Sequence, residues 1–308
     1  MGNGSSIWNS SNTRVVIDSS SNVPASIQAQ YQMLEVPTVV NFGTDSFRTN
    51  IDLTPEAFYE RLVADEHPPT TSQPPPKFFA DAYQQAFADG AEHVIVVTIS
   101  QKLSGTFASA QTAAREFGDQ EMDAQGVQQT ELYDERFLFW DGDSISMGSG
   151  YQAIVAARLL ETGIERAHLV DRLDEIRKSM IGFATLETLK YAARSGRISN
   201  LQASIGNLLQ VKIILDIQHG QILPTGRVRG RKRSLREIVD RQVGHYGSEP
   251  LNVCVLHANA PDDAEKIVAL AQEQLVINEL HIGDIGSAIA SFGGPGAIGI
   301  AGYPANLA

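Results

Sequence analysis

The chain has 308 residues, of which 43% are hydrophobic and 7% aromatic, and it carries a formal net charge of −12. This is the composition of a globular protein, and the length is sufficient for two domains. No run of eighteen apolar residues occurs, and the polar N-terminus lacks the regions of a signal peptide, so neither a transmembrane helix nor a secretory leader is expected.

The first half of the chain alternates between strand and helix patterns. Thr54 is expected to cap a helix that begins at Pro55. The β-branched run at 93–99 is typical of a strand buried on both faces of a parallel sheet. The other expected strands are 15–17, 35–42 and 137–140, and the other expected helices are 77–89, 104–117 and 146–160. This alternation predicts a parallel α/β domain at 14–163, preceded by a disordered tail at 1–13.

The second half predicts a C-terminal α/β domain at 164–308, built on a mixed sheet with helices on one face. Two apolar segments joined by His219-Gly220 indicate a hairpin over 212–228. The lone cysteine, Cys254, lies in an apolar run, which favours a buried thiol and a cytoplasmic location. Helices are expected at 165–180 and 261–276, strands at 181–187 and 251–257, and further segments of the sheet region at 279–282, 285–291 and 297–301.

Polar side chains follow three of the strands expected in the parallel sheet. They are Asp18-Ser19, the 100–104 segment and the 141–144 segment. Because ligands of such sheets bind beyond the carboxyl ends of the strands, these residues are expected to gather at a binding edge.

Two hydroxyl-rich segments are candidates for binding an anion. One is 70–73, Thr-Thr-Ser-Gln, and the other is Ser104-Gly105-Thr106. Ser104 is expected at a helix N-terminus, where free N–H groups and the helix dipole favour negative charge. Capping a helix or stabilising a turn is the alternative role of such hydroxyls, and the two roles are compatible.

Positive charge is concentrated between Lys190 and Arg236, where ten lysines and arginines accompany a single acid, Asp216. Arg194 and Arg197 flank a Ser-Gly turn, and six basic residues occupy 227–236. Guanidinium groups suit carboxylates and phosphates, so this belt indicates a local anion site or a docking patch. No aromatic residue interleaves the 227–236 run, which argues against nucleic-acid binding.

Familiar catalytic and cofactor motifs are absent from the sequence. It contains no phosphate loop, no nucleophile elbow and no clustered histidines or cysteines, so neither a metal site nor a cofactor is expected. Two alternatives to a binding protein remain open. One is a phosphotransferase or hydrolase using Asp18, Asp141 or Asp143, and the other is an RNA- or protein-docking module using 227–236.

Several separated motifs, in the same order, resemble the DegV family of bacterial fatty-acid-binding proteins. The resemblance covers nearly the whole chain after residue 13. The motifs are Val16-Ile17-Asp18-Ser19, 37–42, 52–56, 70–74, 100–106, 141–150, 194–199, 226–232 and Gly294-Pro295-Gly296.

The resemblance implies a two-domain α/β fold with a fatty acid bound between the domains as the only ligand. It also implies a carrier without catalytic residues, whose partner is a fatty acid kinase that uses ATP to form an acyl-phosphate for phospholipid synthesis. The residues that it implies for the fatty-acid carboxylate are Thr71, Ser72, Ser104, Gly105 and Phe292. The residues that it implies for phosphate or kinase docking are Arg194, Arg197, Arg229 and Arg231.

Two positions depart from the family pattern. Family members commonly carry His-Thr-Gly-Pro-Gly near the C-terminus, where this chain has Phe292-Gly293-Gly294-Pro295-Gly296. The departure removes a polar partner for the carboxylate. The second is Pro75, which stands where the family has serine. Lipid binding is expected to survive both changes more readily than coupling to the kinase.

Overall fold

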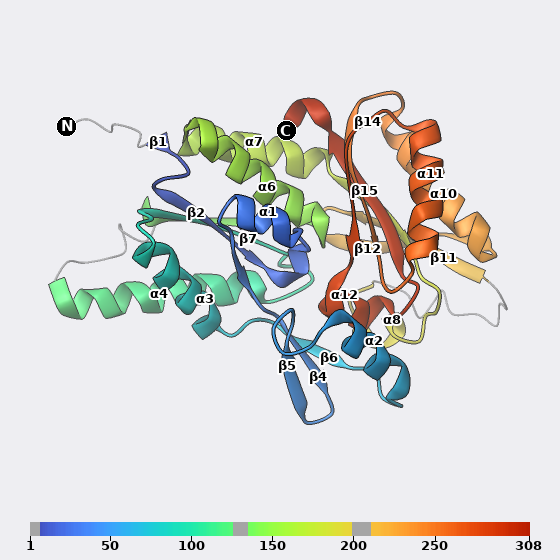
Figure 1. Cartoon of the computed structure of the whole chain (residues 1–308), viewed down its shortest axis with the longest axis horizontal. Coiled ribbons are helices and arrows are strands. Elements are labelled where there is room, and N and C mark those ends of the chain that lie inside the picture. Colours follow the sequence, from blue (N-terminus) through green and yellow to red (C-terminus); the bar gives the residue numbers. More distant parts are fainter. Residues whose placement is uncertain (1–6, 126–134, 199–210) are drawn as a thin grey trace.

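A computed structural model describes residues 7–125, 135–198 and 211–308, and it confirms an α/β fold with one parallel and one mixed sheet. Figure 1 shows the parallel sheet with its helices on the left and the mixed sheet on the right. None of the described helices is both long enough and apolar enough to span a bilayer. The predicted 194–199 motif extends beyond the described residues at Ser199.

The first sheet contains four strands, all parallel. Valine and isoleucine dominate its central strands, and helices bury both faces, as the β-branched run at 93–99 predicted. Its strands, in spatial order, are β3 (Leu34–Val36), β2 (Thr13–Asp18), β7 (His93–Thr98) and β8 (Phe137–Asp141). The accompanying helices are η1 (Ser19–Ser21), α1 (Ala25–Gln30), α3 (Pro76–Ala88), α4 (Thr106–Gln125) and α6 (Met147–Thr162).

The prediction of a single strand at 35–42 is wrong. The chain leaves the parallel sheet after β3, because Pro37 has no N–H group with which to continue the ladder. The Thr38 N–H instead donates to Ser19 Oγ at 2.9 Å, and the chain enters a small antiparallel sheet. This sheet comprises β5 (Asp45–Arg48), β4 (Val39–Phe42) and β6 (Thr70–Ser72).

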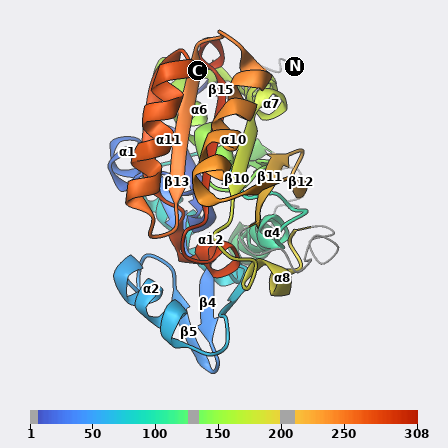
Figure 2. The same ribbon diagram turned by 90° about the vertical axis from the view of Figure 1, so that its right-hand side faces the viewer.

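Helix α2 (Pro55–Ala64) packs beside the small sheet, and together they project from the body of the molecule (Figures 1 and 2). The predicted cap is confirmed, since Thr54 Oγ1 accepts the Ala57 N–H at 3.3 Å. We call α2 and the small sheet the small lobe, and its strand β6 lies near the edge of the parallel sheet.

The second large sheet has six strands and is mixed, because β13 and β14 run parallel while all other neighbours are antiparallel. In spatial order they are β12 (Gln221–Arg229), β11 (Val211–Gln218), β10 (Ile181–Thr185), β15 (Ile298–Pro304), β13 (Leu251–His257) and β14 (Ile277–Asp284). This half begins with β9 (Ile164–Glu165) and α7 (Arg166–Ser179), and its other elements are α8 (Ala192–Ser195), α10 (Arg231–Tyr246), α11 (Pro261–Gln274), α12 (Gly286–Gly293) and η2 (Ala305–Leu307).

Helices α10 and α11 bury one face of the mixed sheet, as expected. The segment at 285–291, assigned from its pattern to the sheet region, is the helix α12. Its residues are small apart from Ile289 and Phe292, and it packs between the small lobe and α8 rather than joining a ladder. The hairpin predicted over 212–228 is confirmed as β11 and β12.

The prediction of a disordered tail at 1–13 is wrong for residues 7–13. Ile7–Trp8 forms the strand β1, which pairs with β9 (Ile164–Glu165) just before α7 (Arg166–Ser179). Trp8 is 1% exposed and stacks on His93, so burial of the indole fixes this segment. Residues 1–6 lie outside the described part.

The boundary predicted at residue 163 falls between the two large sheets, directly after α6, and we retain it as a proposal. The largest hydrophobic core nevertheless crosses this boundary. It joins Ile17 and Ile154 from the first half to Leu215 and Cys254 from the second.

Candidate functional site

A cavity of about 510 Å³ lies between the carboxyl edge of the parallel sheet, the mixed sheet and α12. All five residues expected to bind a carboxylate line it, although they come from separate elements. Thr71 and Ser72 lie on β6, Ser104 and Gly105 precede α4, and Phe292 lies in the last turn of α12.

Most of the hydroxyl residues that line the cavity lie on β6 or follow strands of the parallel sheet, and we call the side that they line its polar end. Residues after β6 and before α4 approach closely there. A Cβ on Gly105 would lie only 2.7 Å from the side-chain amide of Gln73, so glycine permits this contact. Ser104 Oγ accepts the Thr106 N–H at 3.4 Å, which confirms the predicted position before the helix. Other hydroxyl residues lining the cavity are Ser20, Thr38, Ser144, Ser146 and Ser195.

The floor of the cavity is formed by small residues on the two central strands of the mixed sheet. Gly182 and Ala184 on β10 face Ala301 and Gly299 on β15. A Cβ on Gly182 would come within 3.2 Å of the Ala301 Cβ, so Gly182 and Ala301 face the same side of the sheet. Such small side chains take up little space and leave room for the cavity above the strands. All four residues line the cavity, and larger side chains on neighbouring elements form its walls. These walls include Leu186, Leu215, Ile217, Leu256, Ile285 and Ile289.

The thiol of Cys254 also lines this cavity, and the prediction of a buried thiol is confirmed. Burial raises the pKa of Cys254 to about 12, so the group is protonated at neutral pH. It therefore contributes apolar surface to the cavity wall rather than a nucleophile.

The edge residues Asp18, Asp141 and Asp143 lie at the carboxyl ends of the parallel strands, as predicted, but none of them lines the cavity. Asp18 accepts the backbone N–H groups of Ser20 and Ile99, both at 2.8 Å. Asp141 likewise accepts N–H groups from Gln101 and Asp143, and Asp143 pairs with Lys102 at 3.1 Å. These carboxylates hold the loops at the edge of the sheet, and the described residues contain no acidic or histidine cluster suited to a metal.

Asp18 makes the stability of the fold depend on pH. Its burial raises its pKa to about 6, although the two N–H donors oppose the shift. Because the folded-state pKa lies above the unfolded value, the associated stabilisation is complete below about pH 4 and is lost as the pH rises through 6. Relative to Asp18→Asn, the wild-type free energy of unfolding should fall by about 2 kcal/mol between pH 4 and pH 7. Urea denaturation at both pH values tests this, and a difference independent of pH would contradict it.

Of the four arginines expected to contact phosphate or a kinase, the structure brings only Arg197 to the cavity. Arg194 and Arg229 are exposed and lie away from it. Arg231 is turned inward, with its side chain 20% exposed. Only one of the four arginines therefore lines the proposed ligand site.

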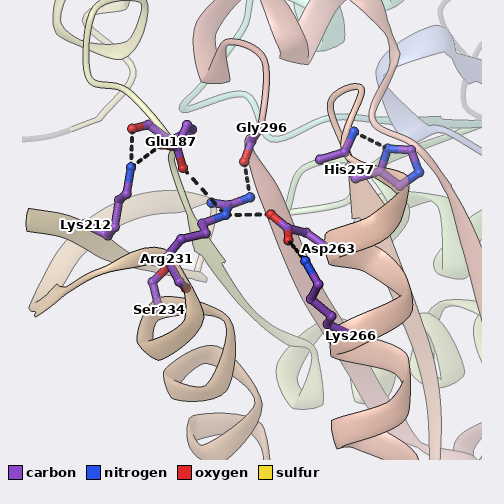
Figure 3. Close-up of polar contacts among 9 residues, drawn as sticks. Glu187, Lys212, Arg231, Ser234, His257, Asp263, Lys266 and Gly296 are labelled. Carbon is purple, nitrogen blue, oxygen red and sulfur yellow. Dashed lines mark hydrogen bonds and ion pairs between the residues drawn. The ribbon is translucent and has the colours of Figure 1, made fainter. Parts of the chain in front are cut away.

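Arg231 lies at the centre of a network that holds the loop after α12 (Figure 3). Its Nε lies 2.8 Å from Asp263 Oδ2 in the first turn of α11, and one terminal nitrogen donates to the Gly296 carbonyl at 2.6 Å. Glu187 lies 3.6 Å away and also pairs with Lys212. The 294–296 loop is thereby fixed between Phe292 and Ala297, both of which line the cavity.

The turn between β11 and β12 connects the second half of the chain to the first. The Gly220 N–H donates to the Asp143 carbonyl at 2.7 Å, and Ser100 Oγ donates to the Gly220 carbonyl at 3.2 Å. Lys102 Nζ donates to the His219 carbonyl at 2.7 Å. A Cβ at Gly220 would collide with Asp143 and Ser100, so only glycine fits this junction.

A second, polar cavity of about 230 Å³ lies beside this turn. It shares Leu103, Ser195, Arg197 and Ile222 with the first cavity. Arg197 therefore stands at the boundary between the larger apolar space and a smaller polar one.

Sequence reasoning missed the floor, the inward position of Arg231 and the contacts of the β11–β12 turn. The sequence does contain a signal for the floor. Gly182 and Ala184 are two residues apart, as are Gly299 and Ala301, and residues two apart lie on the same face of a strand. The pairing of those two strands, more than a hundred residues apart, was not visible in the sequence.

Known proteins match nearly the whole chain. The family model described as DegV, a family of uncharacterised proteins, matches residues 12–305. The chain is 29% identical to Protein DegV of Bacillus subtilis over 293 residues, which is 94% of this chain and 98% of that protein.

Solved structures of similar proteins have the same fold. A Thermus thermophilus protein described as a fatty-acid-binding DegV family protein is 30% identical, with a TM-score of 0.83, covering 95% of this chain and 99% of that one. The Bacillus subtilis structure of DegV, described as a fatty acid binding protein, is 28% identical with a TM-score of 0.80 and the same coverage.

Proposed function

The chain belongs to the DegV family, and from this premise we propose that it is a carrier that binds a long-chain fatty acid. The acyl chain occupies the larger cavity, and the carboxylate lies against the hydroxyl cluster at its polar end. The carrier then presents this carboxylate to a separate ATP-dependent kinase in the cytoplasm, which forms the acyl-phosphate used for phospholipid synthesis.

The observation that carries the proposal is the distribution of polarity in the cavity. Glycines, alanines and aliphatic side chains form its floor and walls, while hydroxyl residues from β6 and the start of α4 line its polar end. Burial of roughly fifteen methylenes at about 0.8 kcal/mol each supplies ample gross affinity, before the cost of ordering the ligand. An amphiphile with one polar end fits this arrangement.

Thr71, Ser72 and Ser104 are the proposed hydrogen-bond donors to the carboxylate. A carboxylate withdrawn from water needs such donors, because an unsatisfied buried charge is strongly unfavourable. Gly105 allows β6 and the start of α4 to approach, and Phe292 closes the same end with an aromatic ring. None of these groups is a general base, which supports a carrier rather than a catalyst.

The arginines proposed to dock the kinase differ in their exposure and in the contacts that they already make. Arg194 and Arg229 are exposed and are available for docking or for contact with a phosphate. Arg231 also belongs to the proposed docking set, although its guanidinium is already held by Asp263 and Gly296. Arg197 belongs to the proposed set as well, since it is exposed at the boundary of the cavity. Docking is therefore expected to depend more on Arg194, Arg197 and Arg229 than on Arg231.

The decisive experiment is lipid extraction of the purified, denatured protein followed by mass spectrometry. A stoichiometric long-chain fatty acid is expected, together with a loss of affinity of about 100-fold in the double variant Thr71→Ala/Ser104→Ala, since two hydrogen bonds to a charged group are removed. Thr112→Ala, which removes an exposed hydroxyl on α4, serves as the matched control. An empty protein that also fails to take up added fatty acid would refute the proposal.

A further inference from the structure

Arg197 is the only charged residue among the described residues that line the larger cavity. The hydroxyl groups at its polar end can donate hydrogen bonds but bring no positive charge. A bound carboxylate therefore has a single candidate for a cationic partner in this part of the chain.

The guanidinium of Arg197 is held in place by contacts of its own. It lies over the Phe292 ring, 5.1 Å from the ring centroid, and Nη1 donates to the Ser195 carbonyl at 2.6 Å. The backbone N–H of Arg197 donates to Ser195 Oγ at 3.2 Å, after a turn in which Gly196 has a φ of +69°. Cation–π stacking and these hydrogen bonds restrict the rotamers of a side chain that is otherwise flexible.

The positive charge of Arg197 is not neutralised within the described chain. No described aspartate or glutamate lies within ion-pair distance of it, whereas Lys102, the other cation of the polar cavity, pairs with Asp143. Arg197 is thus an exposed cation without an acidic partner, at the boundary between the apolar cavity and a polar one.

From this geometry we infer that Arg197, stacked on Phe292, is the cationic partner of the ligand's carboxylate and the residue that selects acids over neutral lipids. The inference rests on the proposed fatty-acid binding and adds to it a specificity determinant. Phe292 acts in it as a positioning residue, because its ring supports the guanidinium without offering a polar atom.

The test compares hexadecanoic acid with hexadecan-1-ol, which has the same chain length but no charge. Arg197→Met should weaken binding of the acid by about 10- to 100-fold, the effect of losing one hydrogen bond to a charged group. Binding of the alcohol should be unchanged, because the apolar walls remain. Arg197→Lys should restore part of the preference for the acid, and Phe292→Leu should reduce it less than Arg197→Met does.

Arg115→Met, an exposed arginine on α4, is the matched control, and thermal melting verifies that each variant is folded. Equal weakening of acid and alcohol in Arg197→Met would overturn the inference, since it would assign Arg197 a role only in the shape of the cavity. Unchanged acid binding would overturn it as well. A wild-type protein that binds neither ligand would instead refute the proposed function, and the inference with it.

Discussion

Ala301→Phe should abolish fatty-acid binding while leaving the protein folded. Ala301 faces Gly182 across the β10–β15 pair and lines the floor of the cavity, so a phenyl group there would occupy the space assigned to the acyl chain. Overpacking of a filled core costs about 1–3 kcal/mol, but a side chain that enters an existing cavity should cost less. The loss of affinity for the fatty acid is expected to exceed about 100-fold, because most of the burial of methylene groups is lost. Lipid content by mass spectrometry measures the binding, and the urea midpoint measures the stability.

Ala64→Phe is the matched control, because it makes the same substitution at an exposed position at the end of α2. This variant should retain both its lipid and its stability. If Ala301→Phe still carried stoichiometric fatty acid, the acyl chain would have to lie elsewhere, and the cavity would lose its proposed role.

Arg231→Met should destabilise the fold by about 3 kcal/mol, the effect of breaking a largely buried ion pair. The substitution leaves Asp263 with Lys266 alone and removes the hydrogen bond to the Gly296 carbonyl. Since the 294–296 loop connects two stretches of the cavity wall, bound fatty acid should also dissociate faster. Urea denaturation and the rate of lipid exchange provide the two measurements.

Arg229→Met is the appropriate comparison, because Arg229 is exposed at the end of β12 two residues earlier. It should leave stability unchanged and, on the proposed function, reduce phosphorylation by the kinase. An Arg231→Met variant as stable as the wild type would show instead that the network in Figure 3 contributes little and that Arg231 is free to serve in docking.

The sequence was sufficient to place the polar residues at the edge of the parallel sheet, because strand ends and short polar motifs are local features. Thr71, Ser104 and Phe292 come together at the cavity as expected, although their roles as ligands stay predictions. The strand predicted at 35–42 failed because Pro37 breaks a continuous apolar pattern and sends its second part to another sheet.

The remaining features depend on contacts between distant segments. The cavity floor arises only when β10 pairs with β15, and the stacking of Arg197 on Phe292 joins residues from α12 and the turn after α8. The inward turn of Arg231 likewise requires Asp263 and Gly296 to be near it. Charge alone suggested a docking residue, whereas tertiary packing determines which arginines remain exposed.

At Gly220 the two halves of the chain meet backbone to backbone, and the largest hydrophobic core crosses the same boundary. Unfolding of either half would therefore expose the core of the other, so we expect the chain to melt in a single cooperative transition. On the proposed function, a fatty acid bound between the halves should stabilise both together, by about 2.7 kcal/mol at a free concentration of 100 times Kd. The chain has two tryptophans, Trp8 and Trp140, and both lie before residue 163. Because the transition is expected to be shared, their fluorescence should also report the melting of the mixed sheet, although neither indole lines the cavity.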